Sequence, residues 1–485
     1  MIKSRFAPSP TGYLHIGSLR TALFAYLFAK KKNGQFLLRI EDTDRERFVE
    51  GSLKNILDSF AWVNIVIDEG VILENDNIIQ KGENGPYIQS ERLDIYQKYI
   101  KELLEKNNAY YCFCSKERLD EMRAIQEANK HATGYDGYCR NLSKDEVAQK
   151  LAKNEKFVIR MKMPDNGLTV LEDMIRGKVE FKNELFDDQV LIKSDGFPTY
   201  HFAVVVDDHL MGITHVIRAE EWLPSTPKHV VLYHMFGWKV PQFAHLSLLI
   251  NEKKQKLSKR NGDVSVVDYV KKGYLPEAFV NFIAFLGWNP GDDREFFSMS
   301  ELEKEFDFAK VGKAPAVFNL EKLNWYNKQY IMKMSAVELS ERCRSFYAEK
   351  NVDIKDFDLT RVVALEQGRA NTLLEIVENT SFIFSENIYE ADLLVWKKSD
   401  KIKTKENLQL TLNFLQDFSG VWSREELEVG VLAWIKDKGL GNGDVLWPMR
   451  VALSGLNNSP GPLEIAGVLG KEKTLARIKI AVDKI

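Results

Sequence analysis

The chain has 485 residues, of which 45% are hydrophobic and 28% charged, and its formal net charge is −3. This length predicts roughly three to five domains, and the composition is that of a globular protein. No stretch approaches the about 18 apolar residues that cross a bilayer, and the first residues lack an apolar signal segment, so we expect a cytoplasmic protein without membrane contact. The acidic balance gives no support for RNA binding, although it does not exclude a locally basic face.

The beginning of the chain predicts a strand, a helix and a second strand. Residues 3–7 (KSRFA) are short, extended and followed by prolines. Residues 18–32 are rich in good helix formers and end in a basic run, and Gly34 fits the helix C-terminus. Residues 35–42 (QFLLRIED) predict the second strand, so the region forms a βαβ unit with parallel strands.

The next part of the chain predicts an amphipathic helix and then an insertion. Residues 91–106 place Leu93, Tyr96, Ile100 and Leu103 on one side of a helix, with Ser90 as a plausible N-cap. Three of the four cysteines and a loop rich in Gly and Tyr then fall within residues 107–190, which we interpret as an insertion into the nucleotide-binding fold.

Strand patterns return after the insertion and then give way to helices. The expected strands are 189–194 (QVLIKS), 203–207 (AVVVD), 215–219 (HVIRA) and 245–250 (HLSLLI). Beyond about residue 325 the periodicity is helical and alternating patterns are scarce, which predicts helical bundles with a separate task.

Two loops contain residues suited to phosphate chemistry. In residues 8–20 (PSPTGYLHIGSLR), between a strand and a helix, Gly12 and Gly17 allow close backbone approach and His15 offers ring N–H donors. In KLSKR (256–260), the lysines can neutralise the charge of a phosphate group. Taken alone, the first loop is equally well an ordinary Pro/Gly turn, and the second is more often a solvated surface.

Charged residues at the ends of the predicted strands suit a zwitterionic dicarboxylic amino acid. Arg5 and Arg218 can pair bidentately with carboxylates, and Glu41 can accept an ammonium group. A network of internal salt bridges is an equally weighted alternative for these three residues.

These segments together resemble class I aminoacyl-tRNA synthetases of the bacterial glutamyl-tRNA synthetase type. Residues 8–20 match the HIGH signature in its PSPTG form, with Ser18 in place of the final histidine, and KLSKR matches the KMSKS signature. The resemblance implies a Rossmann-like parallel-sheet α/β catalytic domain with an inserted α+β acceptor-binding domain, followed by an all-α C-terminal anticodon-binding region.

The resemblance also implies domain boundaries. The catalytic domain would comprise residues 1–98 and 196–325, the second part with the stem-contact region and KLSKR loop. The acceptor-end insertion would comprise 99–195, and two helical anticodon-binding subdomains would comprise 326–380 and 381–485.

The site residues implied by the resemblance fall into three groups. For catalysis they are His15, Gly17 and Lys259; for glutamate binding they are Arg5, Ala7, Ser9, Glu41, Tyr200 and Arg218; for ATP binding they are Thr11, Gly12, His15, Gly17, Glu221, Trp222, Lys256 and Lys259. Family members often have Asn at the position of Val204, so we leave Val204 out of the site.

The cysteines of the insertion are a candidate structural zinc site. Cys112, Cys114 and Cys139 offer three thiolates, and tetrahedral zinc takes a fourth ligand. A shorter relative that modifies tRNA implies Tyr135 as this ligand, whereas zinc-bearing synthetases often have His where this chain has Asn141. His131 is a better ligand chemically but has no counterpart in the family, and three reduced thiols without metal are the alternative.

In the helical region, GRANTLLEI (368–376) resembles the segment with which glutamyl enzymes read the anticodon. Arg369 falls at the position that contacts the last anticodon base, and arginine can bind a splayed base edge. A surface arginine on a helix is the equally weighted alternative.

The resemblance implies a monomeric glutamate–tRNA ligase whose partners are L-glutamate, ATP with Mg²⁺, and tRNA-Glu, with tRNA required even for activation. Relaxed charging of tRNA-Gln stays open. The helical tail disfavours a glutaminyl enzyme, a truncated tRNA-modifying relative and a simple nucleotidyltransferase. Intact signature residues disfavour a non-catalytic RNA-binding paralogue.

Overall fold

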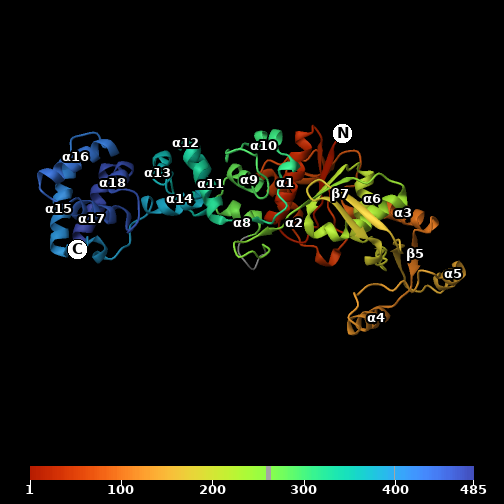
Figure 1. Cartoon of the computed structure of the whole chain (residues 1–485). Helices are drawn as coiled ribbons and strands as arrows, with labels where there is room; N and C mark the ends of the chain where they lie inside the picture. Colours follow the sequence, from red (N-terminus) through yellow and green to blue (C-terminus); the bar gives the residue numbers. More distant parts are fainter. Residues whose placement is uncertain (258–263, 398) are drawn as a thin grey trace. The chain divides into compact units, whose positions relative to one another are not determined.

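The computed structural model describes residues 1–257, 264–397 and 399–485 (Figure 1). The chain divides into two compact units, one comprising Met1–Asp268 and Phe279–Asn319 and the other comprising Tyr269–Ala278 and Leu320–Ile485. Within the described ranges, none of the helices has the length and apolar character needed to cross a membrane.

The first unit is built on a mixed β-sheet. Its strands are β1 (Lys3–Phe6), β2 (Gln35–Leu38), β3 (Glu69–Glu74), β4 (Asn77–Lys81), β7 (Leu168–Asp173), β8 (Gly177–Lys182), β10 (His215–Ala219) and β11 (Gln242–Leu246). In the described part of the chain their order is β4-β3-β2-β1-β10-β11-β7-β8. The six central strands are parallel, whereas β4 and β8 pair antiparallel at the edges. The parallel centre confirms the predicted Rossmann-like α/β fold.

Helix α1 (Ile16–Lys31) follows β1 and packs on β1, β2 and β10. It begins two residues before the predicted start because the side chain of His15 caps it: Nδ1 accepts a hydrogen bond from Gly17 N at 3.0 Å. This cap fixes the backbone of the predicted phosphate-binding turn at the N-terminus of the helix.

The end of α1 differs from the sequence prediction. The left-handed residue after the helix is Asn33, with φ 52°, and not Gly34. Gly34 is required for a different reason: a Cβ at this position would lie 2.3 Å from the carbonyl oxygen of Ile2. The glycine therefore allows the chain to turn closely past β1 and enter β2.

Two further expectations were wrong. The predicted strand 203–207 lies inside helix α6 (Tyr200–Leu210), which packs on α3 (Leu93–Glu105), α7 (Thr226–Phe236) and β9 (Val190–Ile192). A run of buried valines is compatible with a strand or with a helix covered on several sides, and periodicity cannot separate the two. The predicted strand 245–250 is interrupted, with β11 ending at Leu246 and β12 (Leu249–Ile250) pairing with β13 (Ala316–Val317).

Helix α3 buries Tyr96, Ile100 and Leu103 of the four residues that its periodicity predicts on one side, and Leu93 is partly buried against the same cluster. Ser90 is not its N-cap, because Arg92 occupies that position. Ser90 instead donates its backbone N–H and its hydroxyl to the carboxylate of Asp42, at 2.8 and 2.6 Å. This contact holds the segment before α3 against the residues that follow β2.

The predicted insertion contains a second, three-stranded sheet. It is formed by β5 (Ala109–Cys112), β6 (Val158–Met161) and β9, with α4 (Lys116–Ala128) and α5 (Lys144–Ala152) between β5 and β6. Strands β7 and β8 also fall within the predicted insertion but extend the main sheet beyond β11. The other helices of this unit are α2 (Ser52–Trp62) and α10 (Met299–Glu305), and α8 (Val266–Lys271) and α9 (Pro276–Ala284) lie across the boundaries between the units.

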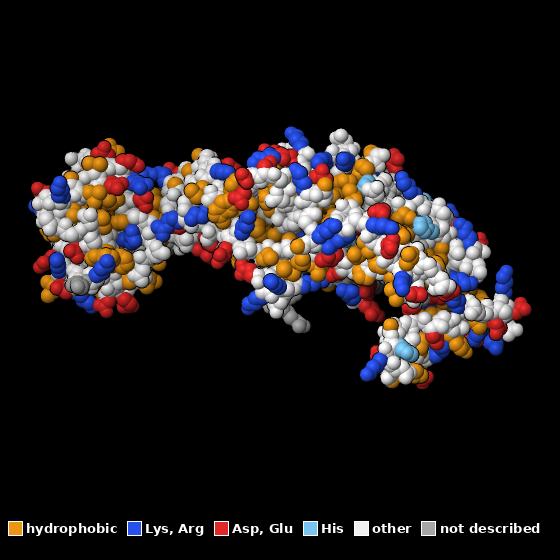
Figure 2. All heavy atoms as spheres, viewed as in Figure 1, with side chains coloured by type: hydrophobic (Ala, Val, Ile, Leu, Met, Phe, Trp, Pro, Cys, Tyr) orange, Lys and Arg blue, Asp and Glu red, His pale blue; other side chains and the backbone are white. Residues whose placement is uncertain are grey.

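The second unit confirms the predicted all-α region. Its helices are α11 (Leu320–Lys333), α12 (Ala336–Glu349), α13 (Leu359–Ala364), α14 (Leu373–Thr380), α15 (Lys401–Asp417), α16 (Arg424–Asp437), α17 (Asn442–Ser454) and α18 (Pro462–Lys484). One cluster of buried side chains runs through both predicted helical subdomains, from Leu339 and Val363 to Val431 and Ile478. Figure 2 shows basic side chains interspersed with acidic ones on the visible face, so the acidic total does not make the surface uniformly acidic.

Candidate active site

A cavity of about 1090 Å³ opens where the parallel strands of the first unit end. Residues after β1, β2 and β10 line it, which is where open parallel sheets bind ligands. The lining contains most of the sequence-predicted site residues: Arg5, Ala7, Ser9, Thr11, His15, Gly17, Glu41, Tyr200, Arg218, Glu221, Trp222 and Lys256. Gly12 is not part of this lining, and Lys259 lies outside the described residues. Val204 is buried in an apolar cluster on α6 and is also absent from the lining.

Two residues of the lining, Arg5 and Glu41, belong to a network of buried charges. Arg5 Nε donates to Asp208 at 3.1 Å, and Asp208 also pairs with Arg39 Nη1 at 2.8 Å. Arg39 Nη2 in turn donates to Glu41 at 3.0 Å. Burial acts to raise the pKa of Asp208, but the two arginines overcome this effect and lower it. Asp208 is therefore ionised, and it compensates the charge of Arg5.

Sequence reasoning missed Arg39 and Asp208. It also missed Asp207, which accepts hydrogen bonds from Arg92 Nε at 2.7 Å and Tyr96 Oη at 2.8 Å and so joins α6 to α3. A signal was available, because all these charged residues adjoin apolar runs in which an unpaired charge would not be tolerated.

Glu41 is the acidic group of this network that lines the cavity. Its pKa is raised to about 7, because burial penalises the ionised carboxylate more than Arg39 and Arg5 favour it. A cation entering the cavity would favour the ionised form. Glu41 is therefore suited to receive an ammonium group, as the sequence predicts.

Arg218 lies on β10 and is 5% exposed. Its Nε donates to His245 Nε2 at 3.1 Å, on the neighbouring strand β11. Nη1 lies 3.4 Å from Tyr200 Oη and 3.2 Å from His229 Nδ1, and Nη2 donates to Thr226 Oγ1 at 2.7 Å. The predicted pair Arg218 and Tyr200 is thus in direct contact, whereas sequence reasoning missed His229, His245 and Thr226.

The other end of the cavity contains the predicted ATP residues. His15 Nδ1 is engaged by the backbone of Gly17, so the neutral ring carries its proton on Nε2. A Cβ at Gly17 would lie 3.3 Å from His15 Nδ1, so a larger residue there would require the ring of His15 to shift by a few tenths of an ångström. Lys256 Nζ pairs with Glu221 at 2.5 Å, and both side chains are largely exposed. His15 and Lys256, which could donate to a phosphate, thus line the same cavity as Glu221, the partner of the lysine.

The ring of Trp222 packs against that of Tyr200, with centroids 4.5 Å apart. Trp222 also accepts a hydrogen bond from Thr226 Oγ1 through its carbonyl oxygen. Trp222, one of the predicted ATP residues, is therefore in contact with the Tyr200 side chain beside Arg218.

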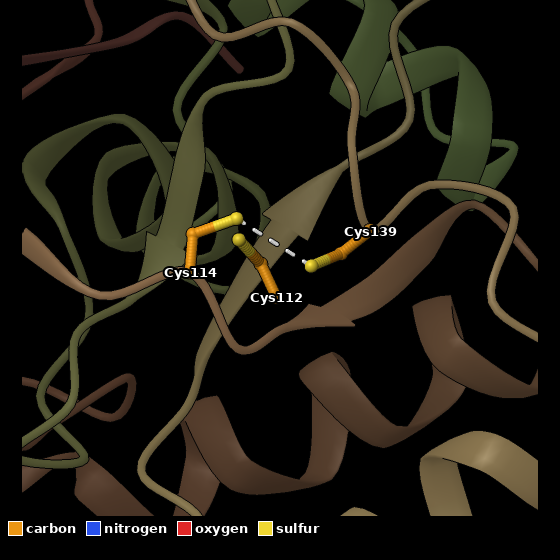
Figure 3. A group of neighbouring side chains, drawn as sticks. All are labelled: Cys112, Cys114 and Cys139. Atoms are coloured by element: carbon orange, nitrogen blue, oxygen red, sulfur yellow. Dashed lines mark hydrogen bonds between the residues drawn. The ribbon is translucent and has the colours of Figure 1, made fainter. Parts of the chain in front are cut away.

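The three cysteines of the insertion converge, as Figure 3 shows. Their sulfur atoms all lie within 4.8 Å of one another, and Cys114 Sγ is 3.6 Å from Cys139 Sγ. Tyr135 Oη lies 3.3 Å from Cys112 Sγ and 3.6 Å from Cys114 Sγ. His131 is exposed and does not belong to this group of potential ligands.

The geometry fits a tetrahedral metal site. Zinc–sulfur bonds of about 2.3 Å place thiolates roughly 3.8 Å apart in a tetrahedron. The distance between Cys114 Sγ and Cys139 Sγ, 3.6 Å, is close to this value. Hydrogen bonding between the Cys112 and Cys139 thiols lowers the pKa of Cys112 and raises that of Cys139, so ionisation is favoured at one of the pair. The residues present can therefore hold zinc with three sulfurs and the Tyr135 oxygen.

Arg369 lies in the second unit, between α13 and α14. Its Nη1 donates to the carbonyl oxygen of Ser459 at 2.8 Å, and Nη2 donates to Asn458 at 3.2 Å. Its Nε lies 3.4 Å from the carboxylate of Glu366. The side chain is 42% exposed, so it is held in position and still accessible.

Two family models match the chain. One, described as tRNA synthetases class I (E and Q), catalytic domain, covers residues 1–325, and one described as anticodon binding domain covers residues 324–482. The chain belongs to this class I tRNA synthetase family.

Relatives of this synthetase family match the chain over its whole length. A protein of Finegoldia magna named glutamate–tRNA ligase is 46% identical over 100% of this chain and 99% of its own. One of Clostridium tetani with the same name is 47% identical over 100% of this chain and 98% of its own. A solved structure from Elizabethkingia meningosepticum, described as a glutamate tRNA ligase in complex with its amino acid, is 40% identical, has a TM-score of 0.88 and covers 99% of each chain.

Proposed function

We propose that this synthetase is a glutamate–tRNA ligase. It activates L-glutamate with ATP to glutamyl-adenylate and pyrophosphate, and transfers glutamate to the 3′-terminal adenosine of tRNA-Glu. The observation that carries this proposal is one cavity lined by Glu41 and by the two buried arginines Arg5 and Arg218. These charges complement those of a dicarboxylic amino acid.

The two carboxylates of glutamate need different surroundings. The α-carboxylate must attack the α-phosphate of ATP, so a buried ion pair would hold back the reacting group. The side-chain carboxylate does not react, and the buried guanidinium of Arg218 suits it. With the ammonium on Glu41, the α-carboxylate is then directed towards the ATP end of the cavity.

The chemistry requires positioning and charge stabilisation. An oxygen of the α-carboxylate forms a bond to the α-phosphorus as the bond to pyrophosphate breaks. A hydroxyl of the terminal adenosine then attacks the acyl carbon, and AMP leaves. His15 Nε2–H and Lys256 are placed to stabilise phosphate charge, and the resemblance assigns the same role to Lys259. Mg²⁺ bound with ATP would supply further neutralisation of that charge.

Aminoacylation tests the proposed function. The purified chain is incubated with ATP, Mg²⁺ and labelled glutamate on transcripts of tRNA-Glu and tRNA-Gln, with labelled glutamine as the parallel substrate. We expect glutamate on tRNA-Glu; the tRNA-Gln sample separates a strict from a relaxed enzyme. No transfer by folded protein would favour a non-catalytic paralogue, and transfer of glutamine would contradict the assignment of the Arg218 end.

We further propose that Cys112, Cys114, Cys139 and Tyr135 bind a structural zinc ion that shapes the acceptor-end insertion. The convergence of three sulfurs and a phenol oxygen supports this proposal. Metal analysis of the purified protein should give about one zinc per chain, and Cys139→Ser should lose it. Cys343, a buried cysteine of the second unit, provides the matched control, because Cys343→Ser should keep the zinc.

We also propose that the enzyme is a monomer.

We further propose that Arg369 contacts the last anticodon base. The accessible position of Arg369 between two helices supports the contact. The unmodified chain should discriminate against tRNA-Glu transcripts with a changed last anticodon base, and Arg369→Ala should lose this discrimination. Equal discrimination by both proteins would favour the purely structural interpretation of its bonds to Ser459 and Asn458.

A further inference from the structure

The two arginines at the glutamate end differ in the partners that hold them. Arg5 pairs with the carboxylate of Asp208, which compensates its charge within the protein. Among the described residues, the hydrogen-bond partners of Arg218 are all neutral: a tyrosine, a threonine and two histidines. These partners account for four of its five N–H groups, which leaves one N–H of Nη2 available for a ligand. Arg218 is thus a buried cation whose hydrogen-bond partners contribute no compensating charge.

Donor–acceptor rules fix the proton on His245. Arg218 Nε can only donate, so His245 Nε2, at 3.1 Å, is an unprotonated acceptor. Burial lowers the pKa of His245, so the ring is neutral near pH 7 and its proton is on Nδ1. That proton is donated to Asp173 Oδ2 at 2.6 Å. The ring of His245 lies between the carboxylate of Asp173 and the guanidinium of Arg218.

The same reasoning fixes the proton on His229. Its Nδ1 lies 3.2 Å from Arg218 Nη1 and must accept a hydrogen bond. Burial is the main cause that lowers the pKa of His229 well below its usual value, so the neutral ring carries its proton on Nε2. Nε2 lies 2.9 Å from His201 Nδ1, which therefore accepts. A second side chain thus holds His229 as a neutral acceptor.

We propose that His229 and His245, each held in one tautomer by His201 and Asp173, are specificity-determining positioning residues. They hold Arg218 by neutral acceptors and leave its charge for the side-chain carboxylate of the amino acid. This inference rests on the proposed function and deepens it. A side-chain amide, as in glutamine, would leave the buried guanidinium uncompensated, and a site with an unpaired buried group rejects such a ligand strongly.

An isosteric pair of variants at His229 tests the inference. The side-chain oxygen of Asn or Asp can occupy the position of Nδ1, so His229→Asn and His229→Asp both accept from Arg218 and both lose the contact with His201. Only His229→Asp adds a negative charge. We expect the KM of His229→Asp for glutamate to exceed that of His229→Asn by about 100-fold. The introduced carboxylate would compensate the charge of the Arg218 guanidinium, which would then bind the ligand's carboxylate more weakly.

Two further readouts separate this effect from general damage. The KM for ATP should stay within about threefold between the two variants, because His229 is not among the residues that line the cavity. The ratio of kcat/KM for glutamate to that for glutamine should fall at least about tenfold in His229→Asp relative to His229→Asn. Equal values for glutamate in the two variants would overturn the inference.

Asp173→Asn tests the tautomer without placing a charge beside the substrate. Asp173 Oδ1 accepts from the backbone N–H groups of Ile175 and Arg176, at 2.9 and 2.8 Å, and Oδ2 accepts from the backbone N–H of His245 at 3.1 Å as well as from its ring. With the amide oxygen of Asn on the Oδ1 side, its NH₂ group faces His245 Nδ1 and favours the Nε2–H tautomer, which opposes Arg218 Nε–H. In the reverse orientation, the neutral amide oxygen holds the Nδ1 proton less strongly than the carboxylate does. We expect KM for glutamate to rise about 10-fold with a smaller change in kcat.

An unchanged KM for glutamate in folded Asp173→Asn would contradict the positioning of Arg218 by His245. The unmodified chain separates this inference from the proposed function: no glutamate transfer by it would reject the function itself. Transfer by the unmodified chain, together with equal behaviour of His229→Asp and His229→Asn, would reject only the inference. Circular dichroism of each variant shows whether it is folded, and the substitutions at His229 and Asp173 test the inference independently.

Discussion

The charged side chains at the two ends of the cavity differ in burial, and therefore in how their charges are stabilised. At the proposed glutamate end, Arg39 is completely buried and Arg5 and Arg218 are 4% and 5% exposed. Arg39 and Arg5 pair with the carboxylate of Asp208, whereas Arg218 is held by neutral acceptors, so the position of each charge is fixed by defined partners. At the proposed ATP end, the side chains of Lys256 and Glu221 are 61% and 46% exposed, and water can replace either partner. Stability and recognition are therefore coupled at the first end and separable at the second.

The largest expected effect comes from breaking the buried network. Arg39→Met keeps the approximate length of the side chain but leaves Asp208 and Glu41 without their shared partner. We expect the free energy of unfolding to fall by about 3–5 kcal/mol, measured by urea denaturation. The exposed pair Lys54–Asp58 is the matched control, and Lys54→Met should leave the denaturation midpoint unchanged. Similar midpoints for the two variants would show that the buried network does not stabilise the first unit.

The same contrast explains what could be predicted from the sequence. The strands and helix around His15, and the residues gathered in the cavity, follow from contiguous motifs and from the resemblance. Arg39, Asp207 and Asp208 could not be assigned partners, because Arg5 and Asp208 are 203 positions apart and only the fold brings them together. The helix α6 was mistaken for a strand for a related reason: its neighbours, and not its own periodicity, determine that its valines are buried.

The histidines around Arg218 illustrate the same limit. His229 and His245 belong to no signature that sequence reasoning singled out, and each is defined by a contact between separate elements. The register that places Arg218 beside His245 on β10 and β11 is a property of the sheet. Residues that contact the ligand are thus easier to predict than those that position them.

A second prediction concerns the pH dependence of glutamate binding. In the proposed function, the ammonium group of the substrate binds ionised Glu41, whose pKa is raised to about 7 by burial. The ionised fraction rises about tenfold between pH 6 and pH 8, so KM for glutamate should fall by about the same factor over this range. Glu41→Gln should weaken binding and remove this dependence. A KM profile of unmodified protein that is flat from pH 6 to pH 8 would contradict Glu41 as the ammonium partner.

The raised pKa of Glu41 also predicts a pH dependence of stability, opposite in sign to that of glutamate binding. Its pKa in the folded protein lies above the usual value of 4.5, so folding is favoured by protonation. The contribution of this group to stability is complete below about pH 4.5 and is lost as the pH rises to about 7. Urea midpoints of the unmodified chain and of Glu41→Gln, compared at pH 5 and pH 8, should therefore diverge at the higher pH, with the variant relatively more stable.

The smallest effect is expected at the exposed end. Lys256→Ala removes the partner of Glu221 and one cation near the phosphates, but it removes no buried contact. We expect an unchanged urea midpoint and an increase in KM for ATP of about 5- to 10-fold, measured with saturating glutamate and tRNA. A large loss of stability in this variant would show that the two ends are not separable.

The position of L-glutamate in a crystal structure of the complex tests the assignment of the cavity most directly. We predict that the side-chain carboxylate contacts Arg218, that the ammonium contacts Glu41, and that the α-carboxylate points towards His15 and Lys256. The α-carboxylate bound at Arg218, with the side chain directed towards the ATP end, would contradict the assignment.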